Sequence, residues 1–267
     1  MNMDNQLFDL TGRVAIVTGG AGLLAAEHAK ALSAFGAIVV LADIQLQRCE
    51  AVVNQLAGDG RAVHAYHCDV TSAQSWQQLC AAVVQQFGKV DILINNAGFT
   101  NQSRSSNYAA GFEDFPLEDW NAIMQVNLTG SFLGCQVIGK QMLAQGKGSI
   151  INMASLYGVV SPHHTIYAGT GVNQPVAYSV SKHGVIGLTK WLATLWAPKG
   201  IRVNSITPGG IYNEHTDPFL ERFQQLNPIG RMSDKSELRG AVVYLAADAS
   251  SHVVGHNLVV DGGWTVW

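Results

Sequence analysis

Tyr178 and Lys182 stand four residues apart within residues 177–196, a stretch whose pattern predicts a helix. Side chains at this spacing lie on the same face of a helix, so the phenol and the ammonium can stack. A phenol with a pKa of about 10 is a poor acid or base at neutral pH, but a neighbouring ammonium favours the phenolate. The pair could therefore move a proton to or from an alcohol oxygen. The spacing alone is weak, because such pairs usually just share a helix surface.

A serine ends the run "SIINMAS", residues 149–155, whose apolar part predicts a buried strand. Ser155 would then lie at the carboxyl edge of a sheet, where α/β proteins bind their ligands. Its hydroxyl could donate a hydrogen bond to a substrate oxygen and stabilise negative charge that develops there.

A glycine-rich turn follows the first predicted strand, residues 13–18. Its residues Gly20, Gly22 and Ala25 satisfy the pattern G-x-G-x-x-G/A. Glycines allow a tight turn and a close approach of the backbone, and the following helix offers N–H groups to a pyrophosphate. The position between a strand and a helix is the one that a dinucleotide-binding turn requires.

An aspartate ends the second apolar run, "AIVVLAD", about twenty residues after this turn. Asp43 could accept hydrogen bonds from both hydroxyls of an adenine ribose, and it would repel a 2′-phosphate. Gln45 and Gln47 precede the next arginine, Arg48, so NAD is expected rather than NADP. The alternative is that Asp43 merely caps a helix.

Short apolar runs alternate with longer helical patterns along the whole chain, which predicts a doubly wound, mainly parallel α/β sheet in one domain, residues 1–267. Two segments are too long for plain connections and follow strands, so we expect substrate loops at 98–116 and 208–233. The expected strands are 13–18, 37–42, 62–67, 90–95, 149–153, 202–206 and 257–260, and the expected helices are 24–35, 45–56, 72–87, 120–143 and 177–196.

Composition excludes several classes of protein. Of the 267 residues, 48% are hydrophobic and 13% charged, which argues against disorder, and the net charge of −3 gives no basic surface for nucleic acid. No apolar run reaches the roughly 18 to 20 residues of a membrane span, and the start "MNMDNQLFDLTG" does not resemble a secretory signal. We therefore expect a cytoplasmic protein.

The cysteines and histidines lack the spacing of metal ligands. The four cysteines stand far apart without a C-x-x-C, so reduced thiols are expected rather than a disulfide framework, and no metal site is proposed. The cysteines are Cys49, Cys68, Cys80 and Cys135, and the histidines without a third ligand nearby in sequence are His64, His67, His252 and His256.

Seven motifs in order and at matching spacing make the chain resemble the classical short-chain dehydrogenase/reductase family over essentially its full length. They are "TGRVAIVTGG" at 11–20, "CDV" at 68–70, "NNAG" at 95–98, "VNLTG" at 126–130, "YSVSK" at 178–182, "IRVNSITPGG" at 201–210 and "VVDGGW" at 259–264.

The resemblance implies a nicotinamide-dependent oxidoreductase with Asn127, Ser155, Tyr178 and Lys182 as its catalytic residues. Asn127 would hold a water that links Lys182 to solvent, although it could instead simply kink its helix. The family also implies a homotetramer, or a homodimer, through the fourth and fifth helices, while the C-terminal "GGWTVW" could pack at a subunit interface. The implied cofactor residues are Gly19, Gly22, Leu23, Leu24, Asp43, Ile44, Asp69, Val70, Asn96, Ala97, Gly98, Tyr178, Lys182, Pro208, Gly209 and Ile211.

Two departures from the family pattern stand out. The family turn T-G-x-x-x-G-x-G would place glycines where this chain has Leu23 and Ala25. Ala25 is small enough, but the Cβ of Leu23 would crowd a pyrophosphate unless the turn is rebuilt around Gly20 and Gly22. We expect such a rebuilt turn that binds NAD, with lower affinity than the family's usual turn.

The second departure is an insertion. Ser155 and Tyr178 are 23 positions apart, where the family usually has about a dozen. Tyr167 lies near the usual distance, but Gly171 follows it at four residues instead of a lysine, which rules it out as the acid/base. We expect residues 156–177 to form a third substrate loop, with contacts from His163, His164 or Tyr167, unless the insertion is only a solvated surface loop.

The expected loops are rich in Asn, Gln, Ser and Arg, as in "FTNQSRSSNYAAGFEDFP" and "YNEHTD". Such a lining suits a hydroxylated substrate, namely a sugar, a polyol or a sugar acid, whose carboxylate Arg104 could bind. The alternatives are an NADP-preferring carbonyl reductase, an isomerase or dehydratase that uses the cofactor transiently, and a non-catalytic relative, which should have lost the tyrosine or the lysine.

Overall fold

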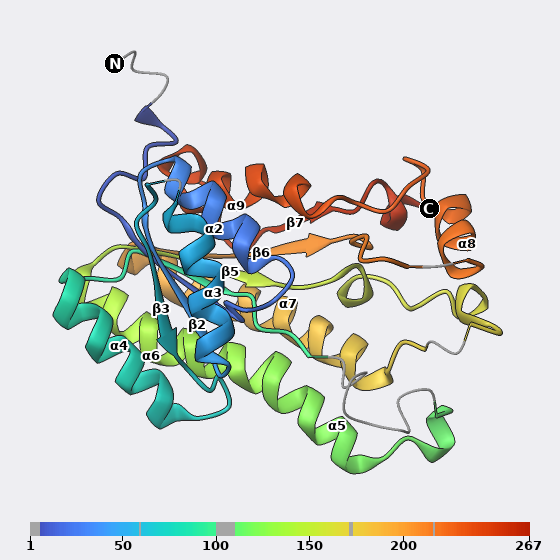
Figure 1. The fold of residues 1–267 in the computed structure, drawn as a ribbon. Coiled ribbons are helices and arrows are strands. Elements are labelled where there is room, and N and C mark those ends of the chain that lie inside the picture. The colour runs from blue at the N-terminus through green and yellow to red at the C-terminus, as the bar shows by residue number, and fades with distance from the viewer. Residues whose placement is uncertain (1–5, 59, 100–109, 171–172, 216) are drawn as a thin grey trace.

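A computed structural model describes residues 6–58, 60–99, 110–170, 173–215 and 217–267. It contains a seven-stranded parallel sheet in the order β3-β2-β1-β4-β5-β6-β7, which confirms the predicted fold class (Figure 1). The chain order reverses between β1 and β4, and the crevice beyond the strands at such a reversal is where this architecture binds ligands. The strands are Val14–Thr18, Ile38–Asp43, Val63–His67, Ile92–Asn95, Gly148–Met153, Ile201–Pro208 and Asn257–Val260.

Alternate residues of the central strands serve two separate cores, as expected for strands covered on both faces. In β1, Ala15 and Val17 belong to one core, whereas Val14 and Ile16 belong to the other. The first core packs against α2 (Ala25–Ala34), α3 (Leu46–Ala57) and α9 (Arg239–Ala246). The second packs against α4 (Ala73–Phe87), α6 (Gly130–Gln145) and α7 (Val176–Trp196).

The helix expected over residues 120–143 is interrupted. The structure has α5 (Leu117–Met124), one π-helical turn at Gln125–Thr129 and then α6. The π turn contains Asn127, whose buried side chain hydrogen-bonds to the backbone of Phe99 rather than to its own helix. Single π turns of this kind are frequent at functional sites, and no spacing in the sequence revealed it.

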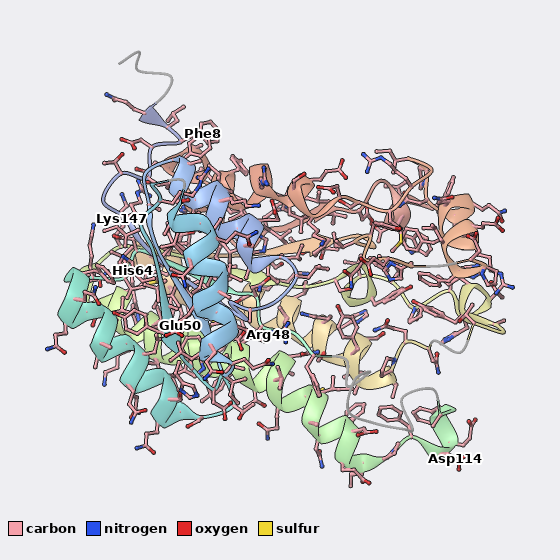
Figure 2. The ribbon with its side chains drawn as sticks, viewed as in Figure 1. Phe8, Arg48, Glu50, His64, Asp114 and Lys147 are labelled. Carbon is pink, nitrogen blue, oxygen red and sulfur yellow. The ribbon has the colours of Figure 1, made fainter. Side chains whose placement is uncertain are left out.

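Several segments extend past the carboxyl ends of the strands, on the side of the molecule where β6 points (Figure 1). They are α5, the insertion after β5 and the helix α8 (Phe219–Leu226). In Figure 2, His64 and Lys147 lie toward the opposite end of the sheet, whereas Arg48 on α3 and the distant Asp114 lie toward this one. The remaining short helices are Phe112–Asp114, Leu156–Gly158, His164–Tyr167, Ala197–Lys199, Lys235–Leu238, Asp248–Ser250 and Trp264–Val266.

The described part of the chain agrees with the expectations for cysteine, and it offers no clustered metal ligands. All four cysteines are free thiols, and burial raises the pKa of Cys49, Cys68 and Cys135 to about 12 each. Within the same residues, no three His, Cys, Asp or Glu side chains come together as a metal site would need. No described helix is long and apolar enough to cross a membrane.

Candidate active site

One cleft of about 1570 Å³ opens beyond the carboxyl ends of the strands. This exceeds the roughly 300 to 1,000 Å³ typical of small-molecule pockets, so it has room for a dinucleotide and a second ligand. Of the residues predicted to be catalytic or to bind the cofactor, all but Asn127 line it: Gly19, Gly22, Leu23, Leu24, Asp43, Ile44, Asp69, Val70, Asn96, Ala97, Gly98, Ser155, Tyr178, Lys182, Pro208, Gly209 and Ile211. We call the part around Gly19 and Asp43 the dinucleotide end.

Three glycines build the turn at the dinucleotide end, each for a different steric reason. Gly19 has a φ of +66°, and a Cβ there would lie 2.9 Å from Cα of Ala97. Gly20 lies against β2 and α3, where a Cβ would approach Sγ of Cys49 to 2.7 Å. The N–H of Gly22 donates to the carbonyl of Gly19 at 2.8 Å and closes the turn. The turn therefore packs too closely on its neighbours to admit side chains at Gly19 and Gly20.

Leu23 and Leu24 lie between this turn and the first residue of α2. Ala25 is fully buried, as the small residue expected at a helix–sheet contact. The side chain of Leu23 is 40% exposed and lines the cleft. The turn thus has its glycines at 19, 20 and 22, and it leads directly into α2, whose first N–H groups are of the kind that binds anions at helix N-termini. These residues fit the pyrophosphate of a dinucleotide.

Asp43 ends β2 with its carboxylate directed at the backbone on either side. Oδ2 accepts from the N–H of Ala21 at 3.0 Å, and Oδ1 accepts from the N–H of Gln45 at 2.8 Å. Gln45, not Asp43, occupies the N-cap position of α3, so the helix-cap alternative is wrong. Arg48 lies closer to the site than its separation in sequence suggested, because α3 brings it into the lining of the same cleft.

The middle of the cleft is held by Thr18 at the end of β1. Its Oγ1 accepts the N–H groups of Asn96 and Ala97, each at 3.0 Å. The amide of Asn96 donates in return to the carbonyl of Thr18 at 2.9 Å. These bonds hold the "NNAG" segment against the end of β1, at the place between β1 and β4 where the chain order reverses.

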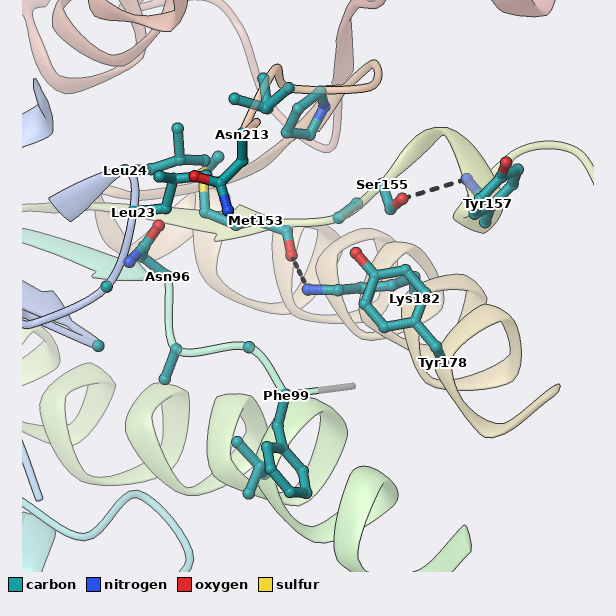
Figure 3. A pocket seen from close by; sticks show the side chains of 18 of the residues that line it. Leu23, Leu24, Asn96, Phe99, Met153, Ser155, Tyr157, Tyr178, Lys182 and Asn213 are labelled. Atoms are coloured by element: carbon teal, nitrogen blue, oxygen red, sulfur yellow. Dashed lines mark hydrogen bonds between the residues drawn. The ribbon is translucent and has the colours of Figure 1, made fainter. Parts of the chain in front are cut away.

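Ser155, Tyr178 and Lys182 come together in the same cleft as the glycine turn (Figure 3). The first turns of α7 carry Tyr178 and Lys182, and Nζ of Lys182 lies 5.6 Å from the centroid of the Tyr178 ring. Nζ donates to the carbonyl of Met153 at 2.8 Å, which fixes it beneath the end of β5. Oγ of Ser155 accepts the N–H of Tyr157 at 3.2 Å, and its hydroxyl lies within hydrogen-bonding reach of the Tyr178 phenol.

Burial has the largest effect on the pKa values of Tyr178 and Lys182. It raises the pKa of the Tyr178 phenol, which the Ser155 hydroxyl opposes in part. Burial also lowers the pKa of the Lys182 ammonium to about 8. With the groups of the protein alone, Tyr178 is therefore protonated at neutral pH, and the lowered pKa that we expect with a positive nicotinamide beside it stays a prediction. A positive charge brought into the cleft would favour the phenolate.

Asn127 is fully buried and lies behind the cleft rather than in its lining. Its Oδ1 accepts the N–H of Phe99 at 2.8 Å, and Nδ2 donates to the carbonyl of Phe99 and to Oγ of Ser181. Its carbonyl accepts the hydroxyl of Ser131 at 2.8 Å. The side chain thus positions the backbone of Phe99, which directly follows "NNAG", and a role in proton relay stays a prediction.

The far part of the cleft, which we call the substrate end, is lined mainly by apolar and aromatic side chains. The insertion is not merely a solvated loop, since Ile166 and Tyr167 are buried. Tyr167 lines the cleft, whereas His163 and His164 are exposed and do not. Arg104 and the polar residues 100–109 lie outside the described residues. The side chains of the substrate end are Leu156, Tyr157, Tyr167, Phe219, Phe223 and Met232, together with the polar Gln174, Asn213 and His215.

All of these residues lie within the predicted loops 156–177 and 208–233, but of their side chains the sequence singled out only Tyr167. Phe219 and Phe223 lie on α8 within the expected lid, and their spacing of four was the only signal of a shared face. Gly209 and Gly210 keep this region tightly packed, because a Cβ would lie 2.7 Å from Cα of Asp261 and 2.5 Å from the ring of Phe223, respectively.

Residues 20–265 match a family model described as enoyl-(acyl carrier protein) reductase, one of the models of classical short-chain dehydrogenases. The chain belongs to the short-chain dehydrogenase/reductase family. It is an oxidoreductase of the alcohol dehydrogenase and carbonyl reductase type that uses a nicotinamide cofactor.

Similar proteins with assigned names act on different substrates. The chain is 38% identical over 264 residues to a D-threitol dehydrogenase of Mycolicibacterium smegmatis, covering 97% of this chain and 95% of that protein. It is 41% identical over 254 residues to a 3-alpha-(or 20-beta)-hydroxysteroid dehydrogenase of Mycobacterium tuberculosis, with coverages of 95% and 90%. A gluconate 5-dehydrogenase from Burkholderia cenocepacia, solved with NADP and tartrate, superposes with a TM-score of 0.88 at 29% identity over 99% of both chains.

Proposed function

We propose that this protein is an NAD-dependent dehydrogenase of a secondary alcohol, or reductase of the matching ketone, on a hydroxylated substrate such as a sugar, polyol or sugar acid. The observation that carries the proposal is the meeting of Ser155, Tyr178 and Lys182 in the same cleft as the glycine turn. A binding module would have no need of a buried phenol and ammonium beside each other.

The proposed mechanism assigns one task to each side chain. Tyr178 takes the proton of the alcohol during oxidation and returns it during reduction. Ser155 donates a hydrogen bond to the substrate oxygen and holds it next to the phenol. Lys182 keeps a positive charge near Tyr178 and so favours the phenolate. When bound, the nicotinamide cofactor supplies the hydride chemistry, and the protein contributes position and electrostatics.

The cofactor would lie with its pyrophosphate on the turn of Gly19 to Gly22 and its adenine ribose at Asp43. A carboxylate at the ribose favours NAD over NADP, because it repels a 2′-phosphate. The nearby Arg48 supports NADP as the alternative, since a guanidinium binds phosphate well. Its Nη1 donates to Oε1 of Gln45 at 3.0 Å, which holds it beside the acidic group. The Asp43 carboxylate stands nearer the turn, and NAD is the cofactor we propose.

A panel of sugars, polyols and sugar acids, each with NAD⁺ and with NADP⁺, tests the proposal through the absorbance of the reduced cofactor. We expect steady formation of NADH with at least one compound. The Tyr178→Phe variant should lose about 10² to 10⁴-fold in turnover while its affinity for NAD is unchanged. Near-normal turnover of this variant would refute the assignment, and conversion of a substrate without net NADH would favour the isomerase or dehydratase alternative.

We also propose that the protein is a cytoplasmic homotetramer in which residues 156–177 and 208–233 serve as substrate loops. Exposed apolar side chains on α6, on α7 and at the C-terminus support an assembly: Phe132 is 46% exposed, Trp191 64% and Trp267 77%. Light scattering of the purified protein should give four times the mass of 28.6 kDa. A monomer at micromolar concentration would contradict the assembly.

A further inference from the structure

The wall of the substrate end is an apolar cluster in its own right, separate from the two cores that cover the sheet. Tyr157, Tyr167, Phe223 and Met232 are all at most 8% exposed within it, and Phe219 packs against them. These side chains come from two segments far apart in the sequence, the insertion and residues 219–232, and each of them also lines the cleft. Aromatic side chains held by packing therefore border the substrate end of the cleft.

The tyrosine hydroxyls on this wall are engaged with each other. The hydroxyl oxygens of Tyr157 and Tyr167 are 2.6 Å apart, so one donates to the other. This pairing satisfies part of the hydrogen-bonding capacity of both hydroxyls.

Contacts between the insertion and α8 hold the wall in place. The rings of Tyr167 and Phe219 have centroids 5.4 Å apart, and Phe223 stacks on Trp264 at 4.3 Å and 19°. Nη1 of Arg222 donates to the carbonyl of Ala168, which ties α8 to the insertion. A wall held by ring packing and by a charged hydrogen bond is a preformed surface rather than an adaptable one.

Among the described residues of the substrate end, the polar side chains beside this wall are Gln174, Asn213 and His215. Nδ1 of His215 accepts the N–H of Asn213 at 3.2 Å, so the neutral ring carries its proton on Nε2 as a donor. Burial lowers the pKa of His215, which keeps the ring neutral. With Gln174, Ser155 and Tyr178, these groups supply the polar contacts that the described residues offer a ligand at the wall.

An open-chain polyol fits such a surface poorly. It carries oxygen in every direction, so contact with the wall would bury hydroxyls without partners, which is unfavourable. A six-membered ring has flat C–H faces that can lie against aromatic carbon and gain from burial. A ring also loses less conformational entropy on binding than a flexible chain does.

We propose that the substrate is a ring-shaped hydroxylated compound, such as a cyclic diol, a cyclitol or a sugar in its ring form, with one face against Tyr167 and Phe219. This inference rests on the proposed function and narrows its substrate class. The names of similar proteins leave the matter open, because one acts on a linear tetritol and another on a fused-ring steroid.

Two matched pairs of substrates test the inference with the full-length protein and NAD⁺. One pair is cyclohexane-1,2-diol and hexane-3,4-diol, and the other is myo-inositol and D-mannitol. The members of each pair have the same number of carbons and hydroxyls and differ in ring closure. In at least one pair, we expect kcat/KM to be at least tenfold higher for the ring compound than for the open-chain compound. If the open-chain compound is oxidised as fast or faster in both pairs, the inference is wrong.

Substitutions of Phe219 test whether the wall causes the preference for ring substrates over open-chain substrates. Phe219→Ser should bring the ratio of ring to open chain to within threefold of one, with unchanged affinity for NAD by calorimetry. Phe219→Leu keeps the apolar volume, replaces the flat ring, and should lower the ratio at least threefold even if the serine variant fails to fold. The control Phe35→Ser changes an exposed phenylalanine at the end of α2, away from the cleft, and should preserve the ratio. Retention of the ratio in both Phe219 variants would overturn the role of the wall.

Failure of the inference is distinguishable from failure of the proposed function. If none of the four compounds is oxidised but other alcohols give NADH, the ring substrate is wrong and the dehydrogenase activity stands. If no alcohol gives NADH and Tyr178→Phe behaves like the wild type, the proposed function itself is wrong.

Discussion

The two ends of the cleft are built in different ways. The dinucleotide end consists of backbone turns at the ends of neighbouring strands, where Gly19, Asp43 and Asn96 are placed by β1, β2 and β4. The substrate end consists of side chains from the insertion and α8, which reach the cleft only because they pack on one another. The contrast indicates that the first end depends on local conformation and the second on tertiary packing.

This difference bears on how each end responds to change. A glycine turn is fixed by backbone geometry that few residues can adopt, so its cofactor is constrained by the fold. A wall such as the pair of Tyr167 and Phe219 can be altered by substitution without disturbing the sheet. Ser155, Tyr178 and Lys182 lie between the two ends, and any substrate must place its reacting carbon there.

The largest expected effect on the rate comes from a substitution at Lys182, which lies between the dinucleotide end and the substrate end. Lys182→Met removes the buried ammonium and should lower kcat for alcohol oxidation by about 10² to 10⁴-fold. Oxidation requires deprotonated Tyr178, so the rate rises with pH through the pKa of the phenol. Loss of a positive charge raises that pKa. The rising limb of log kcat against pH should therefore move to higher pH, which initial rates between pH 6 and 11 would measure.

The matched control is Lys190→Met, which changes an exposed lysine on the same helix. It should leave both the rate and the pH profile unchanged. A Lys182 variant with normal turnover, or with an unshifted pH profile, would show that proton transfer by Tyr178 does not depend on the Lys182 ammonium.

The next effect concerns the dinucleotide end alone. Asp43→Asn removes the charge that repels a 2′-phosphate and retains an oxygen that can accept a backbone N–H. The preference for NAD⁺ over NADP⁺, as a ratio of kcat/KM values, should fall about 10- to 100-fold, the range of a charge placed to disfavour one ligand. The preference between ring and open-chain substrates should stay constant.

Asp114→Asn is the control for this change, since Asp114 lies on the short helix before α5, far from Arg48 (Figure 2). If the wild type already prefers NADP⁺, Arg48 rather than Asp43 determines the choice. A substrate preference that shifts together with the cofactor preference would contradict the independence of the two ends.

The same contrast explains how much the sequence could predict. The strands were placed to within two residues, because apolar runs mark buried strands. Asp43 and Ser155 were predicted from their places at the carboxyl ends of strands, and Tyr178 from its spacing to Lys182 and the family resemblance; all three line the cleft. The contact of Tyr157 with Tyr167 and the approach of Arg48 to the cleft were not found. The first depends on how the insertion folds back, and the second on the orientation of α3, which no local pattern fixes.

The π turn at Asn127 belongs with the unpredicted features for a similar reason. Its residues read as ordinary helix, and the extra residue in the turn is accommodated by bonds to Phe99 and Ser181 from other segments. Tertiary partners decided the local conformation there, as they did at the substrate end.

The smallest expected effect tests whether the variant glycine turn limits cofactor binding. Leu23→Gly removes a side chain that lines the cleft beside the start of α2. We expect NAD to bind about three- to tenfold more tightly by isothermal titration calorimetry, which corresponds to roughly 0.6 to 1.4 kcal/mol. Thermal stability should fall slightly, because glycine loses more backbone entropy on folding.

Leu117→Gly is the matched control, since Leu117 is an exposed leucine at the start of α5 outside the lining of the cleft. It should lose a similar amount of stability without a change in NAD affinity. Weaker NAD binding by Leu23→Gly would mean that the leucine side chain covers the dinucleotide instead of crowding it. In that case side-chain packing would contribute to NAD binding at the dinucleotide end, as it does to the structure of the substrate end. The two ends would then differ only in how much they depend on side-chain packing.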